Sequence, residues 1–333
     1  MAMRRFRVTE ASMLPALAPG DEVAAVDDRR PVVGDVVVFP HPEREGFWMI
    51  KRAARPPEPI GADRMWALSD NAEVTRADSR TFGPVPAGSA LRVVDRLDAE
   101  THRQACALLA SEDRALARAI DRFGAPELRR RRPGLPTLTL LVLEQQVSLE
   151  SAAALFARLA EAAGDVSAGS LARLGAEGMR SIGVTRRKAD CLAGLAERAI
   201  SGELDFGALD DDPGRVARER LTTLRGIGPW TADTYLLSAQ GRPDVFPVGD
   251  RALRVGAAET LGLGSVPGEE ELRILGEPWR PVRAAAARII WRAYMSKRGR
   301  KPPPDPRSVR AEGPRAAGEP PDDPDARERS QQV

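Results

Sequence analysis

The spacing of apolar residues changes near residue 98, and this change constrains the fold more than any other feature of the sequence. Before it, short β-branched runs such as 32–39 are separated by Pro, Gly and Asp, which is typical of strands. After it, apolar residues recur three and four positions apart, as in 189–200, which is typical of amphipathic helices. We therefore expect an α+β multidomain chain, with a β-rich domain over residues 1–97 and an all-α domain over residues 98–300.

Length and composition agree with this division. A chain of 333 residues favours two domains over one. No apolar run approaches the eighteen or so residues expected of a membrane span, and the basic start at 1–7 does not lead into the apolar core of a secretory signal. We expect a cytoplasmic protein with no membrane partner. Residues 301–333 are rich in Pro and charge and almost without apolar residues, which predicts a disordered tail.

Cysteine content and charge limit the cofactors and indicate the partners. Cys106 and Cys191 are the two cysteines of the chain, too few for a four-cysteine zinc or iron–sulfur site, so we expect no metal and no other cofactor. The net charge of +2 is small, but basic clusters stand at 129–132, 186–188 and 297–301. Each cluster alone is most simply a solvated helix end. Together they permit a phosphate-binding face.

A tight hairpin is predicted where Gly226 and Gly228 flank the apolar Ile227. Pro229 suits the first turn of the helix that follows, because its missing N–H would have no partner there, and Thr231 belongs to the same turn. Bare backbone amides and the positive helix N-terminus together favour an anion such as phosphate. The alternative is a purely structural turn, since Gly-x-Gly before a helix is common.

Asp250 follows this hairpin after one predicted helix and a Pro-Gly loop that can return the chain to the same cleft. A carboxylate in that place faces whatever nucleic acid the hairpin binds. The alternative is an N-cap for the helix that starts at Arg251, a role that Asp performs well. One residue can serve both roles.

The hairpin and Asp250 together resemble the helix-hairpin-helix DNA glycosylases, most of all the branch of 3-methyladenine DNA glycosylase II. The likeness extends over about two hundred residues, with motifs in the family order at 108–127, 140–148, 182–188 and 279–291. It implies an enzyme that flips an alkylated base out of double-stranded DNA. By the same resemblance, Asp250 is the catalytic carboxylate, which stabilises an oxocarbenium-like sugar and assists water.

The resemblance also assigns the base pocket. Bifunctional relatives carry a lysine two residues after the second hairpin glycine and form a Schiff base with it, whereas this chain has Trp230 there. An indole cannot form an imine, which implies a monofunctional enzyme that leaves an abasic site. Trp230 and Trp291 match pocket aromatics whose faces attract a positively charged purine, and ordinary helix packing is the alternative for either. A further pocket tyrosine of the family is replaced by Thr234.

The residues expected to contact DNA come from two loops. Gln145 and Gln146 match the family loop that enters the duplex where the base has left, and the alternative for them is a plain surface position. The hairpin supplies the other expected contacts, which are Gly226, Ile227, Gly228 and Thr231. We expect the protein to bind damaged duplex DNA as a monomer, with an affinity that falls as salt rises.

A second resemblance lies before residue 98. Residues 12–21, which include Ser12, together with Lys51 and the segments 69–71 and 78–85, are similar to motifs of the signal peptidase I family. The resemblance implies a β fold in which Ser12 is the nucleophile and Lys51 the general base, acting on a peptide. Self-cleaving SOS repressors use the same dyad on a related fold.

This second set of motifs departs from the family pattern at three points. Glu10 stands where a small residue is usual, the serine that supports the lysine is replaced by Thr75 or Arg76, and no membrane anchor is expected. A retained fold with weak or lost peptidase activity is therefore the alternative to an active dyad. Because motifs for two activities are present, we also consider a peptidase tethered to DNA by its helical domain, and an alkylation sensor that uses both sites.

Overall fold

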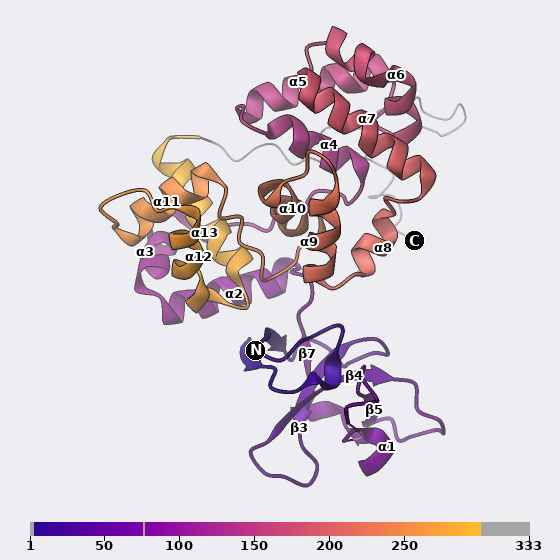
Figure 1. Ribbon diagram of the computed structural model, residues 1–333. Coiled ribbons are helices and arrows are strands. Elements are labelled where there is room, and N and C mark those ends of the chain that lie inside the picture. The colour runs from indigo at the N-terminus through magenta and orange to yellow at the C-terminus, as the bar shows by residue number, and fades with distance from the viewer. Residues whose placement is uncertain (1–2, 76, 301–333) are drawn as a thin grey trace, which may run out of the picture.

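The computed structural model describes residues 3–75 and 77–300, and the predicted tail at 301–333 lies outside these ranges. In Figure 1 the strands gather at the bottom of the view and the helices form two groups above them. The predicted order of a β-rich part followed by a helical part is confirmed.

One antiparallel sheet contains the strands of the described residues, in the order β1-β2-β7-β3-β4-β5-β6. The strands are β1 (Arg4–Arg7), β2 (Glu22–Val26), β3 (Val36–Pro40), β4 (Trp48–Ala54), β5 (Arg64–Leu68), β6 (Val85–Pro86) and β7 (Leu91–Val93). The short helices between them are η1 (Ala11–Met13), α1 (Ser79–Phe82) and η2 (Ala87–Ser89). Because side chains alternate along a strand, β4 turns Met49, Lys51 and Ala53 to the buried face.

Helices follow from Asp98, which caps the first of them through a reciprocal pair of hydrogen bonds with Thr101. The longer helices are α2 (Ala99–Glu112), α3 (Arg114–Phe123), α4 (Leu135–Glu144), α5 (Leu149–Ala163), α6 (Ala168–Ser181), α7 (Arg186–Ser201), α9 (Gly214–Thr223), α11 (Arg251–Leu261) and α13 (Arg283–Lys297). The shorter ones are α8 (Phe206–Asp211), α10 (Pro229–Tyr235), the π-helical turn η3 (Leu236–Gln240), α12 (Glu269–Leu275) and η4 (Glu277–Trp279).

The helical part has two apolar cores. One lies among α4 to α10 and includes Leu141 and Leu192, and the other lies among α2, α3 and α11 to α13 and includes Leu116 and Ile290. Val26, from strand β2, is buried in the second of these cores, so the sheet packs directly against that helical group. The two helical groups lie side by side in Figure 1, with α10 between α4 and α13.

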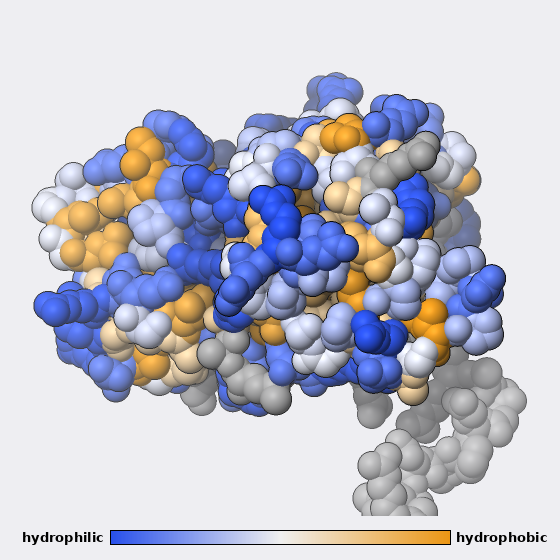
Figure 2. All heavy atoms as spheres, turned by 90° about the horizontal axis from the view of Figure 1, so that it is seen from below, coloured by the Kyte–Doolittle hydropathy of each residue, from blue (hydrophilic) through white to orange (hydrophobic). Residues whose placement is uncertain are grey.

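Among the described residues, no helix combines the length and the apolar character that a membrane crossing requires. Figure 2 shows the molecule from below, where hydrophilic and hydrophobic residues are interspersed over the visible face.

Candidate active site

An open groove of about 2710 Å³ extends between the two helical cores. It is lined by the loop between α4 and α5, by the hairpin between α9 and α10, by the start of α11 and by one face of α13. These segments carry the residues that the sequence predicts for DNA binding, base recognition and catalysis. The groove therefore brings together residues that are far apart in the chain.

Asp250 lies in this groove with hydrogen-bond donors on both of its carboxylate oxygens. Trp230 Nε1 donates to Oδ2 and Trp291 Nε1 donates to Oδ1, each at 3.0 Å. The backbone N–H of Leu253 also donates to Oδ1, at 2.7 Å, so Asp250 is the N-cap of α11. Because an ionised carboxylate only accepts hydrogen bonds, these three donors suit the charged form and hold it in one orientation.

The two indoles come from different helices and meet at this carboxylate. Trp230 stands in the first turn of α10 and Trp291 on α13, and both rings are half-buried and line the groove. The sequence predicts pocket aromatics at these positions but not the hydrogen bonds of their N–H groups to Asp250. Those bonds orient the ring edges toward the carboxylate, and the stacking role of the ring faces stays a prediction.

The hairpin is anchored through its middle residue and its first glycine. Gly226 has a φ of +87°, and a Cβ on it would lie 2.6 Å from Cys191 Sγ, so both its conformation and its surroundings require glycine. The Ile227 side chain is 3% exposed, and its N–H donates to Leu224 O at 3.0 Å. Ile227 therefore supports the hairpin from inside. Gly228 is exposed and opens α10, with nothing within 4 Å of the place a Cβ would occupy.

The two glutamines of the α4–α5 loop take different positions. Gln145 turns inward, and its Nε2 donates to Gly226 O at 3.1 Å and to the buried Thr231 hydroxyl at 3.0 Å. Gln146 is exposed and has a φ of +58°, the left-handed region that a residue other than glycine seldom adopts. Gln145 and Thr231 thus connect the loop to the hairpin, and Gln146 is the glutamine that faces solvent.

Lys188 has a role that its place in a basic cluster does not suggest. Its ammonium donates to Leu143 O and to Gln145 O, both at 2.8 Å, where α4 ends. The side chain is buried, and burial lowers its pKa. Lys188 is therefore not available to the phosphate-binding face that the basic clusters together permit. Its spacing from the buried Leu192 was the sequence signal for a position on the apolar face of α7.

The β-rich part brings the predicted peptidase residues Ser12 and Lys51 within hydrogen-bonding distance. Ser12, on η1, and Lys51, on β4, are 2% and 3% exposed, and Lys51 Nζ lies 2.9 Å from Ser12 Oγ. Burial lowers the pKa of Lys51, and the nearby carboxylates of Asp78 and Glu10 oppose this effect only in part. A buried serine beside a lysine with a lowered pKa is the arrangement that a serine–lysine dyad needs.

Asp78, whose charge acts on Lys51, is itself held by several hydrogen bonds. Burial disfavours the charge of Asp78, but hydrogen bonds from the Arg80 side chain and from the backbone of Ser69 and Arg80 outweigh it and lower the pKa of Asp78 to about 2. Asp78 also caps α1, which begins at Ser79. In the motif 78–80, Asp78 therefore has a structural role as the hydrogen-bonded N-cap of α1.

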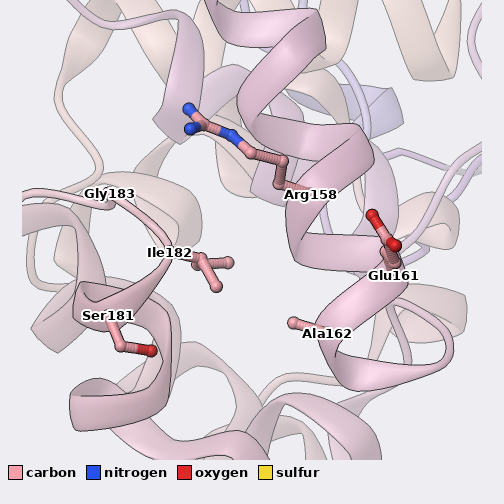
Figure 3. Close-up of a pocket in the computed structure, with 6 residues that line it drawn as sticks. All are labelled: Arg158, Glu161, Ala162, Ser181, Ile182 and Gly183. Carbon is pink, nitrogen blue, oxygen red and sulfur yellow. The ribbon is translucent and has the colours of Figure 1, made fainter.

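A smaller hollow of about 620 Å³ lies between α5 and the turn that joins α6 to α7. Figure 3 shows Arg158, Glu161 and Ala162 on one helix, opposite the turn that carries Ile182. This hollow contains none of the residues that the sequence predicts for catalysis, base recognition or DNA binding. We therefore place the candidate active site in the large groove.

Comparison with known proteins agrees with the geometry of the groove. Residues 140–281 match the family described as HhH-GPD superfamily base excision DNA repair protein. The DNA-3-methyladenine glycosylase of Bacillus subtilis is 29% identical over 163 residues, which cover 45% of this chain and 54% of that protein. DNA-3-methyladenine glycosylase 1 of Schizosaccharomyces pombe is 33% identical over 118 residues, which cover 34% of this chain and 50% of that protein.

A solved structure gives the same result for the fold. The 3-methyladenine DNA glycosylase of Schizosaccharomyces pombe, in complex with abasic DNA, superposes with a TM-score of 0.54 at 27% identity, covering 59% of this chain and 97% of that chain. The chain spans about half the length of the first curated relatives it matches. The hairpin, the two glutamines and Asp250 fall inside the matched range. Residues 140–281 therefore form an HhH-GPD domain, with 3-methyladenine DNA glycosylases among its homologues.

Proposed function

We propose that the chain is a monofunctional DNA glycosylase that excises alkylated purines in base excision repair. The observation that carries this proposal is the Asp250 carboxylate in the groove, with a tryptophan N–H on each of its oxygens at 3.0 Å. The relatives named DNA-3-methyladenine glycosylases support it. A protein that only tethered DNA would need the hairpin but no oriented carboxylate.

The chemistry follows from the charge that develops on the sugar. A base within a duplex is inaccessible, so the nucleotide must leave the stack and enter the groove. When the glycosidic bond breaks, positive charge forms on the sugar, and a fixed carboxylate stabilises it without having to reorganise. Asp250 is held by donors from three elements and so presents that charge in one place. The same carboxylate can accept a proton from the water that adds to the sugar.

The groove lacks a free amine next to this carboxylate among the described residues. Trp230 occupies the position that the Schiff-base lysine takes in bifunctional relatives. Lys188 also lines the groove, but its ammonium is bonded to two backbone carbonyls at 2.8 Å. Neither residue can supply a nucleophilic nitrogen to the sugar. The product is therefore an intact strand that contains an abasic site.

DNA binding is expected on the open side of the groove. Gly228 at the start of α10, the exposed Gln146 and the exposed Arg187 lie along it. The backbone at Gly228 can approach a phosphate closely because no side chain intervenes. Gln146 has the length and the hydrogen-bonding groups to fill the gap that a flipped base leaves.

The test is base release from methylated duplex DNA by the full chain. We use the full chain because Val26 of the sheet is buried in a helical core. The expected products are free 3-methyladenine and 7-methylguanine, with no strand cleavage and no adduct after borohydride reduction. Undamaged duplex is the control. Trapped covalent protein, or a preference for 8-oxoguanine, would contradict the proposal.

A second function is favoured by the geometry of Ser12 and Lys51. We propose that residues 1–97 form a signal-peptidase-like domain in which Lys51 removes the proton of the Ser12 hydroxyl, which lies 2.9 Å away. Cleavage is expected to be slow, because Thr75 or Arg76 stands where a supporting serine is usual. We expect it to occur within the chain itself.

The test of this second function compares the wild type with Ser12→Ala by mass spectrometry, in the presence and absence of methylated DNA. Ser89→Ala is the matched control, because Ser89 lies exposed on η2 of the same sheet. Fragments that appear in the wild type and in Ser89→Ala but not in Ser12→Ala support the dyad. If all three proteins fragment equally, or if none fragments, the domain has kept the peptidase-like fold without peptidase activity.

A further inference from the structure

The wall of the groove contains a buried arginine without an anionic partner. Arg288, on α13, lines the groove and is 9% exposed. Its Nη2 donates to Leu237 O at 2.9 Å, its Nη1 has only a long contact of 3.5 Å to Arg129 O, and its Nε has no partner. Among the described residues, the hydrogen-bond contacts of Arg288 are to backbone carbonyls and none is to a carboxylate. A buried guanidinium normally has a carboxylate beside it, so this one is available to bind something else.

The titratable groups near Arg288 do not neutralise it. Burial and the charge of Arg288 lower the pKa of His102 to about 4, so this imidazole is neutral at physiological pH. Burial raises the pKa of Cys106 to about 12, so this thiol is neutral as well. The remaining charged neighbour is another cation, Arg130. The positive charge in the wall of the groove is therefore uncompensated.

The groove has a second buried polar atom without a hydrogen-bond partner. Thr234, on α10, lines the groove, and its Oγ1 is buried without a hydrogen-bond partner. A buried hydroxyl without a partner is unfavourable, and a valine would fill the same volume without that cost. The position therefore suits a hydroxyl that acquires its partner only when a ligand enters the groove.

Each of these two groups lies one helical turn from a tryptophan of the groove. Thr234 follows Trp230 by four residues on α10, and Arg288 precedes Trp291 by three residues on α13, so each lies one helical turn from an indole that contacts Asp250. One turn is about 5.4 Å, comparable to the length of a purine. The bond from Arg288 to the carbonyl of Leu237, just beyond Thr234, brings the guanidinium toward the same end of the groove.

We propose that Arg288 and Thr234 form a hydrogen-bonding subsite for the 6-carbonyl oxygen of the flipped purine, which makes Arg288 a specificity-determining residue. A guanidinium can only donate, so it bonds a carbonyl and disfavours the amino group that adenine carries at the same position. This inference rests on the proposed glycosylase function and narrows its substrate class. The enzyme selects 6-oxo purines, such as 7-methylguanine, over 6-amino purines, such as 3-methyladenine.

The test uses Arg288→Met and Thr234→Val in the full chain, with Arg103→Met as the matched control. Arg103 lies on α2, outside the groove, with an exposed side chain. The first readout is the ratio of single-turnover release rates for 7-methylguanine and 3-methyladenine from methylated duplex. We expect Arg288→Met to lower this ratio about tenfold, because a hydrogen bond to a charged donor is lost for one base only. An unchanged ratio, or an equal loss for both bases, overturns the inference.

A second readout does not depend on catalysis. Binding of the free bases 7-methylguanine and 3-methyladenine is followed by quenching of the tryptophan fluorescence, to which Trp230 and Trp291 of the groove contribute. The wild type is expected to bind 7-methylguanine more tightly, and both variants are expected to lose that preference. If no base is released from DNA, the proposed function fails. The subsite is then supported if the wild type prefers 7-methylguanine and the variants do not, and it is overturned if the wild type shows no preference. Thermal unfolding identifies a variant that fails to fold, and Thr234→Val, which leaves the charge intact, then decides the result.

Discussion

Replacement of Asp250 by asparagine separates the charge of this residue from its structural roles. Asparagine has the same shape and is an equally good N-cap, so its side-chain oxygen can still accept from the N–H of Leu253 and from the Trp291 indole. The amide nitrogen would then face Trp230 Nε1, and two donors would oppose each other where the wild type has a bond of 3.0 Å. The variant keeps α11 and loses the negative charge.

The size of the catalytic effect follows from Coulomb's law. A carboxylate about 4 Å from a sugar cation, in a half-buried site with an effective dielectric constant of about 20, contributes about 4 kcal/mol. On the proposed mechanism, loss of that term is expected to slow base release about a thousandfold. The lost hydrogen bond with Trp230 lowers the free energy of unfolding by about 1–3 kcal/mol, which leaves the protein folded.

The assay is single-turnover release of 7-methylguanine from methylated duplex with enzyme in excess, together with DNA affinity from fluorescence anisotropy. We expect Asp250→Asn to bind DNA as the wild type does and to release the base about a thousand times more slowly. Asp190→Asn is the control, because Asp190 is an exposed carboxylate on α7 outside the groove. A folded Asp250→Asn protein with release within tenfold of the wild type would refute the reasoning.

Three further predictions concern the supports of the site. Gly226→Ala should lower the free energy of unfolding by about 1–3 kcal/mol and weaken DNA binding, because its Cβ would meet Cys191 Sγ at 2.6 Å. Gly228→Ala is the control: its Cβ meets nothing within 4 Å, so chemical denaturation should show unchanged stability. Gln145→Leu should weaken DNA binding about tenfold, because the hairpin loses both bonds from Nε2, and normal affinity in anisotropy would disprove this. The pKa of His102 is about 4 in the folded protein and about 6.5 when unfolded, so the folded state binds fewer protons between these pH values. The free energy of unfolding should therefore fall by about 3 kcal/mol as pH drops from 6.5 to 4. In urea titrations, His102→Gln should remove this pH dependence.

Local patterns in the sequence were sufficient to predict the order of strands and helices and to single out the hairpin and Asp250 as candidates. The change of apolar spacing near residue 98 predicts the change from strands to helices, because strand and helix periods differ and each needs one apolar face. The two hairpin glycines and Asp250 are recognisable because a sharp turn and an N-cap each demand particular residue types. These features depend on neighbours in the chain, and a single sequence displays them directly.

The partners of the charged and polar side chains were decided by the tertiary structure alone. Lys188 reads as part of a surface cluster, yet it caps the carbonyls at the end of α4, and Gln145 turns into the hairpin rather than outward. The two indole bonds to Asp250 and the unpaired guanidinium of Arg288 arise where α10, α11 and α13 meet. Periodicity predicts which face of a helix is buried, but the group that a buried polar atom meets belongs to another element, whose position depends on how the two helical cores pack.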